Sequence, residues 1–131
     1  MFSFIKAPST AFALGDVVTF NGSGQIIPAV AGSTTIAGVI KRAVVASDAD
    51  YASASFVPVE VFTHGDVFEI DCSTTVTQAM VGTLRDLTSA STLNVGAGAT
   101  VNQFRILGLG STTTKALVAC IKNAFASSVT A

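Results

Sequence analysis

Hydrophobic and polar residues alternate with a period of two in several parts of the chain, a pattern typical of half-buried β-strands. Three valines of residues 56–62 fall on one face, and two acidic residues of 67–72 alternate with apolar ones. The residues between these runs include Gly65, which readily adopts the positive φ of a tight turn. The pattern therefore predicts a β-hairpin over residues 56–72, with its turn at 63–66.

A second hairpin is predicted closer to the start of the chain. Residues 17–20 and 25–27 are mostly apolar, and the segment between them contains Asn21, Gly22 and Gly24, which is a strong turn signal. The following residue, Pro28, has no backbone N–H, so it limits further pairing of the returning strand.

Further short elements are predicted along the rest of the chain. Residues 34–45 are rich in β-branched side chains, and Gly38 is expected to mark a bulge or a bend. The later elements are a helical turn at 77–80, strands at 83–87 and 103–107, the second ended by Gly108 and Gly110, and a strand at 114–121. The last of these is apolar on both faces, which favours a central or doubly covered strand. Residues 115–125 are also compatible with a short amphipathic helix, but their Val, Ile and Cys content favours a strand.

Many short strands with glycine-bearing turns predict an all-β fold, a small β-barrel or sandwich with at most one short helical turn. The chain has 131 residues, which suits a single domain. We expect this barrel-like domain to span residues 15–123. An extended N-terminal arm, residues 1–14, precedes it, and a flexible tail of small and polar residues, 124–131, follows it.

The N-terminal arm lacks clean alternation and is rich in large apolar side chains. These are Phe2, Phe4, Ile5 and Phe12. Because Lys6 and Pro8 interrupt the apolar stretch, it does not form the unbroken core of a secretory signal. An apolar arm is costly in water unless it docks, so two roles are open: it closes the barrel of its own chain, or it reaches a neighbouring subunit.

Composition narrows the possible functions. Half of the residues are hydrophobic and only 11% are charged, well below the roughly 25% of an average soluble domain. This argues against disorder and favours a surface that meets a partner. The net charge is −1, and the largest basic cluster is the pair Lys41 and Arg42. The clustered Lys and Arg side chains typical of a nucleic-acid-binding protein are therefore missing from the sequence.

Candidate catalytic chemistry is sparse. The single histidine, His64, lies in a predicted turn beside Asp66, and no nucleophile elbow accompanies the pair. Asp48 and Asp50 have the spacing of a cation site but lack the further oxygen ligands that such a site needs. We therefore expect a protein that is not an enzyme and has no metal or cofactor. The competing hypothesis, a small hydrolase or ligand-binding barrel, would use His64, Asp66 and Asp48.

The two cysteines, Cys72 and Cys120, each lie in an apolar run. Buried thiols are the default expectation, and a disulfide stays open because spacing alone does not decide it. The longest late apolar run, residues 116–121, is too short to span a bilayer. No membrane partner is expected.

Several of these segments together carry a resemblance to a known family. They are Gly15–Ala29 with its glycine turn, Thr35–Ile40, the paired runs 57–62 and 65–70, the helical turn at 77–82, and the strands at 104–108 and 115–119. Their order resembles that of small phage head-decoration, or capsid cement, proteins. The arm and the Ser/Thr-rich residues 88–100 do not map onto that pattern.

The resemblance implies a structural role in a virion. Such proteins form trimers at three-fold and quasi-three-fold positions on the outer capsid surface and bind the major capsid protein lattice. The alternatives are another virion part, such as a head-fibre base or tail-tube component, and the small hydrolytic or ligand-binding barrel. The partner-binding elements are expected in the arm and in the loops around Asp48 and Ser89. The candidate residues are Phe2, Phe4, Ile5, Lys6, Phe12, Asp48, Asp50 and Tyr51.

Overall fold

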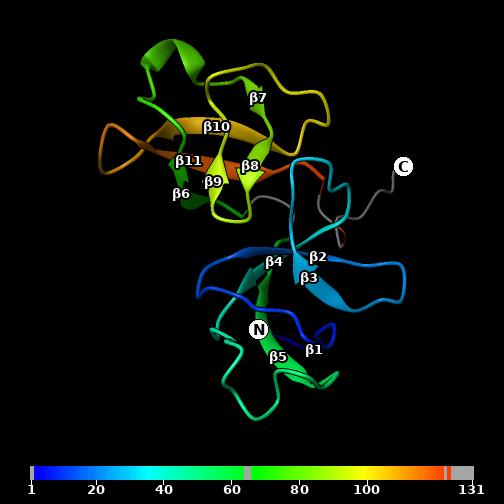
Figure 1. The fold of residues 1–131 in the computed structure, drawn as a ribbon. Helices are drawn as coiled ribbons and strands as arrows, with labels where there is room; N and C mark the ends of the chain where they lie inside the picture. Colours follow the sequence, from blue (N-terminus) through cyan, green and yellow to red (C-terminus); the bar gives the residue numbers. More distant parts are fainter. Residues whose placement is uncertain (1, 64–65, 123, 125–131) are drawn as a thin grey trace.

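The computed structural model describes residues 2–63, 66–122 and 124, and these form two β-rich halves that pack against each other (Figure 1). The first half is a five-stranded sheet with the order β1-β5-β4-β2-β3. Its strands are β1 (Phe2–Ile5), β2 (Val17–Phe20), β3 (Ile26–Pro28), β4 (Ile36–Ile40) and β5 (Phe56–Val61). All neighbouring strands in this sheet are antiparallel.

The second half is a six-stranded sheet with the order β7-β10-β11-β6-β9-β8. Its strands are β6 (Phe68–Cys72), β7 (Leu84–Arg85), β8 (Leu87–Ser89), β9 (Thr92–Leu93), β10 (Phe104–Leu109) and β11 (Lys115–Cys120). The two outermost strands, β7 and β8, are separated in the sequence only by Asp86, so the sheet curls into a nearly closed barrel. A single 3-10 turn, η1 (Gln78–Met80), completes the described elements. The all-β prediction is confirmed.

The first sheet also curls until its two edges meet at one end. Beyond β1, Lys6 forms a parallel bridge with Ile26 of β3, and the Ala7 N–H donates to the Ile26 carbonyl at 3.0 Å. The predicted hairpin of β2 and β3 is present, and β3 ends at Pro28 on the edge of the sheet. Proline on this edge removes one N–H that another strand would use.

The hairpin predicted over residues 56–72 is wrong. Its two runs are strands, but β5 pairs with β1 and β4, whereas β6 pairs with β11 and β9 in the other sheet. The chain therefore crosses from one half to the other between them. The Phe62 and Phe68 rings stack across this crossing at 4.7 Å between centroids. His64 and Gly65 of the predicted turn lie outside the described residues.

Two hydrophobic clusters fill the molecule. The larger lies inside the second sheet and extends to the facing side of the first, where Val17, Ile36 and Phe62 join Phe104 and Ile106. The smaller lies on the opposite face of the first sheet. The strands β2 and β4 contribute to both clusters, because successive side chains of a strand point to opposite faces.

Two glycine-bearing strands depart from regular pairing. The register of β2 and β4 shifts beside Gly38, as the sequence predicted for this residue. The prediction that the strand at 103–107 ends at Gly108 is wrong, because β10 continues to Leu109. The register of β10 and β11 shifts between Ile106 and Gly108, so the glycine bends the strand without ending it.

A buried polar network joins the two halves. Gln103 is fully buried; its Nε2 donates to the carbonyls of Val30 and Ser33 at 2.9 and 2.8 Å, and its Oε1 accepts from the Leu87 N–H at 2.7 Å. Val30 and Ser33 belong to the first half, and Leu87 begins β8 of the second. Asp86, at the corner of the barrel, accepts the backbone N–H of Gln103 at 3.0 Å.

Asp86 makes the fold sensitive to acid. Its carboxylate also accepts the N–H groups of Thr100 and Val101, both at 2.8 Å. Burial raises the pKa of Asp86, but the hydrogen bonds from Val101, Thr100 and Gln103 outweigh it and hold the pKa below the ordinary value of 3.8. Since the folded-state pKa is depressed, this stabilisation is complete above the unfolded-state pKa and is lost as pH falls through the folded-state value.

We expect Asp86→Asn to lower the free energy of unfolding at pH 7 by about 2 kcal/mol. The amide replaces one accepting carboxylate oxygen with an NH₂ group, which cannot accept a hydrogen bond from the backbone N–H groups that face it. In urea titrations between pH 7 and pH 2, the difference between wild type and variant should shrink below about pH 4. Asp48→Asn, at an exposed turn, is the matched control. A difference that persists unchanged down to pH 2 would contradict this role of the Asp86 charge.

The two cysteines are free thiols in the described structure. Cys72 is buried, and Cys120 packs at the edge of the larger cluster. Burial raises the pKa of both, and that of Cys120 to about 12. Both therefore stay protonated at neutral pH.

Candidate interaction surface

The N-terminal arm folds onto its own chain. β1 pairs with β5 along its whole length, from Phe2 opposite Val59 to Ile5 opposite Phe56. Of the two roles open from the sequence, the structure shows the first. Phe4 packs against the smaller cluster and meets Phe20 edge-on at 5.5 Å, and Phe12 is buried in the same cluster.

Lys6 is fully buried, so its side chain does not lie on the surface. Its ammonium donates to the carbonyls of Tyr51 and Ser53 at 2.8 and 2.7 Å. The backbone of the arm also bonds to this loop: the N–H of Lys6 donates to the Ser55 carbonyl, and the N–H of Ser9 donates to the Tyr51 carbonyl. The arm and the loop around Asp48, both predicted to bind a partner, are thus held side by side.

The loop around Asp48 is internally tied. Arg42 donates to both carboxylate oxygens of Asp50, at 2.9 and 2.7 Å, and this hydrogen bond holds the pKa of Asp50 below its usual value. Asp48 accepts the Val45 N–H at 2.9 Å, as turn-capping aspartates do. Tyr51 packs against the smaller cluster. These three candidate residues therefore shape the loop.

The backbone of β1 is open on one side over its first residues, away from the end where Lys6 bridges Ile26. Pro58 of β5 lies opposite Ser3, and its carbonyl accepts from the Lys41 N–H on the far side of β5. Hydrogen-bonded and non-bonded pairs alternate in an antiparallel ladder, so Phe2 and Phe4 bond to β5 while the N–H groups of Ser3 and Ile5 point outward. Among the described residues no strand pairs with β1 on this side at Ser3, whereas at Ile5 the bridge between Lys6 and Ile26 brings β3 alongside.

Large apolar side chains flank this edge. Phe2, Ile5 and Phe56 are 61%, 39% and 64% exposed, and Ile5 lies directly opposite Phe56 in the register. On the other face of the sheet, Phe2 and Phe4 line a hollow of about 350 Å³ together with Val61 and Thr63. An open strand edge bordered by apolar side chains and without a charge or proline is a natural site for strand addition.

Sequence reasoning found Phe2 and Ile5 but missed Phe56. A signal for it was present: if the valines at 57, 59 and 61 face the core, Phe56 must face outward. The loop around Ser89, also expected to bind a partner, contacts the first half instead, because the Val17 N–H donates to the Ala90 carbonyl at 2.7 Å.

The residues considered for hydrolysis do not form a described site. His64 lies outside the described residues, and Asp66 accepts the N–H and hydroxyl of Thr63 at 2.8 and 2.9 Å. Within the described part of the chain, no three His, Cys, Asp or Glu side chains come together as metal ligands.

The comparisons with known proteins leave the family open. The sequence matches no protein-family model, and no curated protein matches it. Over the described residues, the structure contains no helix with the length and apolar character needed to cross a membrane.

Proposed function

We propose that this chain is a structural protein of a phage virion that decorates and stabilises the capsid. It binds the lattice of the major capsid protein from the outside, as a symmetric oligomer, with a trimer at three-fold and quasi-three-fold positions as the expected form. It has no catalytic role, and it binds no cofactor and no nucleic acid.

The open edge of β1 is the observation that carries this proposal. Pro28 blocks part of β3, the other edge strand, and β3 covers β1 only at its end, where Ile26 bridges Lys6. The rest of β1 presents an open edge at Ser3, beside the exposed Phe2, Ile5 and Phe56. Soluble proteins normally protect such edges, because an exposed apolar edge aggregates. Its presence supports a partner strand that completes the sheet. The buried Lys6 and the tied loop beside it hold this edge rigid, which lowers the entropy lost on binding.

The low charge of the chain agrees with a lattice-bound protein. Burial of apolar surface against the capsid contributes roughly 25 cal/mol per Å² to the binding free energy, before the entropy lost on association is subtracted. Many copies on one capsid add avidity to a modest individual contact.

The test is binding to capsids of the same phage prepared without this protein. Ile5→Asp puts a charge beside the added strand, and Ser3→Pro removes an outward N–H without breaking a β1–β5 hydrogen bond. In co-sedimentation titrations we expect each change to weaken binding about tenfold or more, the equivalent of about 1.4 kcal/mol. Leu107→Asp, at an exposed apolar residue of β10 in the other half, is the control for Ile5→Asp.

Sedimentation equilibrium of the free protein measures the oligomer. A monomeric wild-type protein that ignores capsids contradicts the proposed function. Unchanged binding by both edge variants contradicts the role of β1 while leaving decoration intact.

A further inference from the structure

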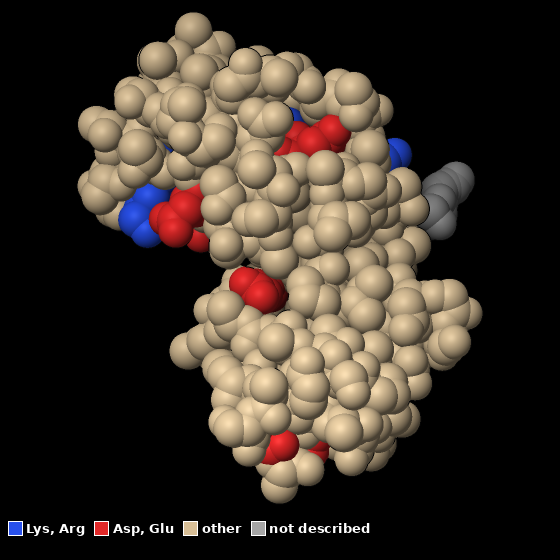
Figure 2. Space-filling view, in the orientation of Figure 1, with Lys and Arg blue, Asp and Glu red and all other residues tan. Residues whose placement is uncertain are grey.

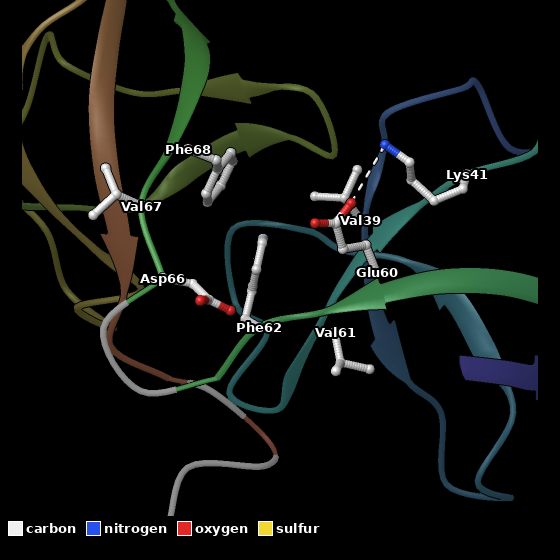
Figure 3. A pocket seen from close by; sticks show the side chains of 8 residues that line it. All are labelled: Val39, Lys41, Glu60, Val61, Phe62, Asp66, Val67 and Phe68. Atoms are coloured by element: carbon white, nitrogen blue, oxygen red, sulfur yellow. Dashed lines mark ion pairs between the residues drawn. The ribbon is translucent and has the colours of Figure 1, made fainter. Parts of the chain in front are cut away.

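The two halves of the molecule leave a groove between them, on the side where the chain crosses from β5 to β6. Figure 2 shows this indentation, with acidic side chains at it, and Figure 3 shows the side chains along part of it. It consists of two adjoining hollows of about 260 and 350 Å³ that share Val39 and Phe68. We call it the waist groove and define it by Asp16, Val39, Glu60, Asp66, Phe68 and Glu69.

The floor of the waist groove is apolar. Val39 of β4 and Phe68 of β6 are only partly buried and pack at the border of the larger cluster. Leu14 lines the rim and is among the most exposed apolar side chains of the described residues. Hollows of this size, with an apolar floor and polar walls, accommodate the side chains of a bound segment.

The walls carry an excess of negative charge. Five carboxylates line the two hollows against two lysines, Lys41 and Lys115. These lysines are already engaged, Lys41 with Glu60 at 3.5 Å and Lys115 with Asp71 at 2.7 Å. Within the described residues, the carboxylates of Asp16, Asp66 and Glu69 form no salt bridge and accept hydrogen bonds only from uncharged groups, Glu69 from the Ser111 N–H and hydroxyl at 2.6 and 3.0 Å. The whole chain has a net charge of only −1, so the groove concentrates negative charge.

The backbone of β6 is open toward the waist groove. The Cys72 N–H donates to the Thr114 carbonyl beside β11, and bonded and non-bonded pairs alternate along this antiparallel ladder. Glu69, opposite Leu117, is therefore a non-bonded pair, and its N–H and carbonyl point away from β11. β9 pairs only with Asp71 and Cys72, so no described strand covers β6 at Glu69.

We propose that the waist groove binds an extended segment of a partner protein whose side chains alternate between basic and apolar. The segment adds to the open edge of β6 by backbone hydrogen bonds at Glu69. Its apolar side chains cover Val39 and Phe68, and its basic side chains meet Asp16, Asp66 and Glu69. This surface is centred on β4 and β6, although Val61 lines both its smaller hollow and the hollow beside β1. It does not depend on the capsid role proposed above.

The probe is an acetylated, fluorescein-labelled octapeptide of alternating lysine and valine, titrated with wild-type protein by fluorescence anisotropy at low salt. We expect saturable binding that weakens as salt is raised. A second peptide carries N-methyl groups on alternate residues, which keeps its charge but removes half of its backbone donors. We expect it to bind about tenfold more weakly, because backbone pairing provides much of the affinity in strand addition.

Matched variants locate the site. Asp66→Asn removes a groove carboxylate that caps the N–H three residues before it, and Asp48→Asn removes an equivalent carboxylate outside the groove. We expect Asp66→Asn and Glu69→Gln each to weaken binding about threefold, and Asp48→Asn to leave it unchanged. Ala13→Trp fills the hollow and should abolish binding, whereas Ala11→Trp, outside the lining, should not.

Hydrogen exchange gives an independent readout of the β6 edge. The Glu69 amide should exchange more slowly when the peptide is bound. The inference is overturned if the lysine–valine peptide does not bind, if both peptides bind equally, or if Asp48→Asn weakens binding as much as Asp66→Asn. A negative result with this peptide does not contradict the capsid role proposed for β1. That role is tested separately, by capsid binding of the Ser3→Pro and Ile5→Asp variants.

Discussion

Gln103→Leu is expected to lower the free energy of unfolding by about 3 kcal/mol or more, one of the largest effects of any single substitution in this chain. Leucine fits a similar volume but makes no hydrogen bond. The Leu87 N–H and the Ser33 carbonyl would then lose this partner, whereas the Val30 carbonyl keeps the Ser33 N–H at 3.1 Å. A buried backbone group left without a partner costs about 1–3 kcal/mol, and two are affected.

Urea unfolding, followed by fluorescence of the single Tyr51 and by far-UV circular dichroism, measures this effect. Gln78→Leu is the control, since Gln78 lies exposed on η1. Because Gln103 connects the two halves, we also expect faster hydrogen exchange in the 30–33 loop of the variant. A Gln103→Leu protein as stable as wild type would show that the amide network contributes nothing net to the fold.

Local patterns in the sequence predicted the strands well, because alternation and turn residues act over a few positions. The hairpin of β2 and β3 and the helical turn at η1 are examples. Such local patterns did not predict which strands pair with each other. β5 pairs with β1, and β6 with β11, each from a distant part of the chain, and only the closure of both sheets decides this pairing.

The candidate surface was predictable in the same partial way. Exposure of Phe2 and Ile5 followed from an apolar arm without clean alternation. The burial of Lys6 did not follow, because its ammonium is satisfied by carbonyls at Tyr51 and Ser53 that only the folded loop supplies. The buried network of Asp86 and Gln103 was not predictable for the same reason. Both residue types usually lie on the surface, and their hydrogen-bond partners are backbone groups distant in the sequence.

Gly38→Ala is the second change expected to have a large effect. A Cβ atom at Gly38 would lie 2.1 Å from the Glu60 carbonyl oxygen and 2.8 Å from the Val61 Cα. Both obstacles are backbone of the paired strand β5, which cannot move aside as a flexible side chain would. We therefore expect Gly38→Ala to cost about 3 kcal/mol, at the upper end of what overpacking costs in a protein core.

Gly22→Ala and Gly32→Ala are matched controls, since a Cβ at either position meets nothing within 4 Å. Both should leave the urea midpoint nearly unchanged. The consequence of Gly38→Ala also reaches the interaction surface, because β4 supports β5 and β5 supports β1. Under conditions where the variant stays folded, β1 should exchange its Phe2 and Phe4 amides faster than in wild type. If the variant is stable and β1 stays protected, the close approach of β4 and β5 is not what holds the open edge in place.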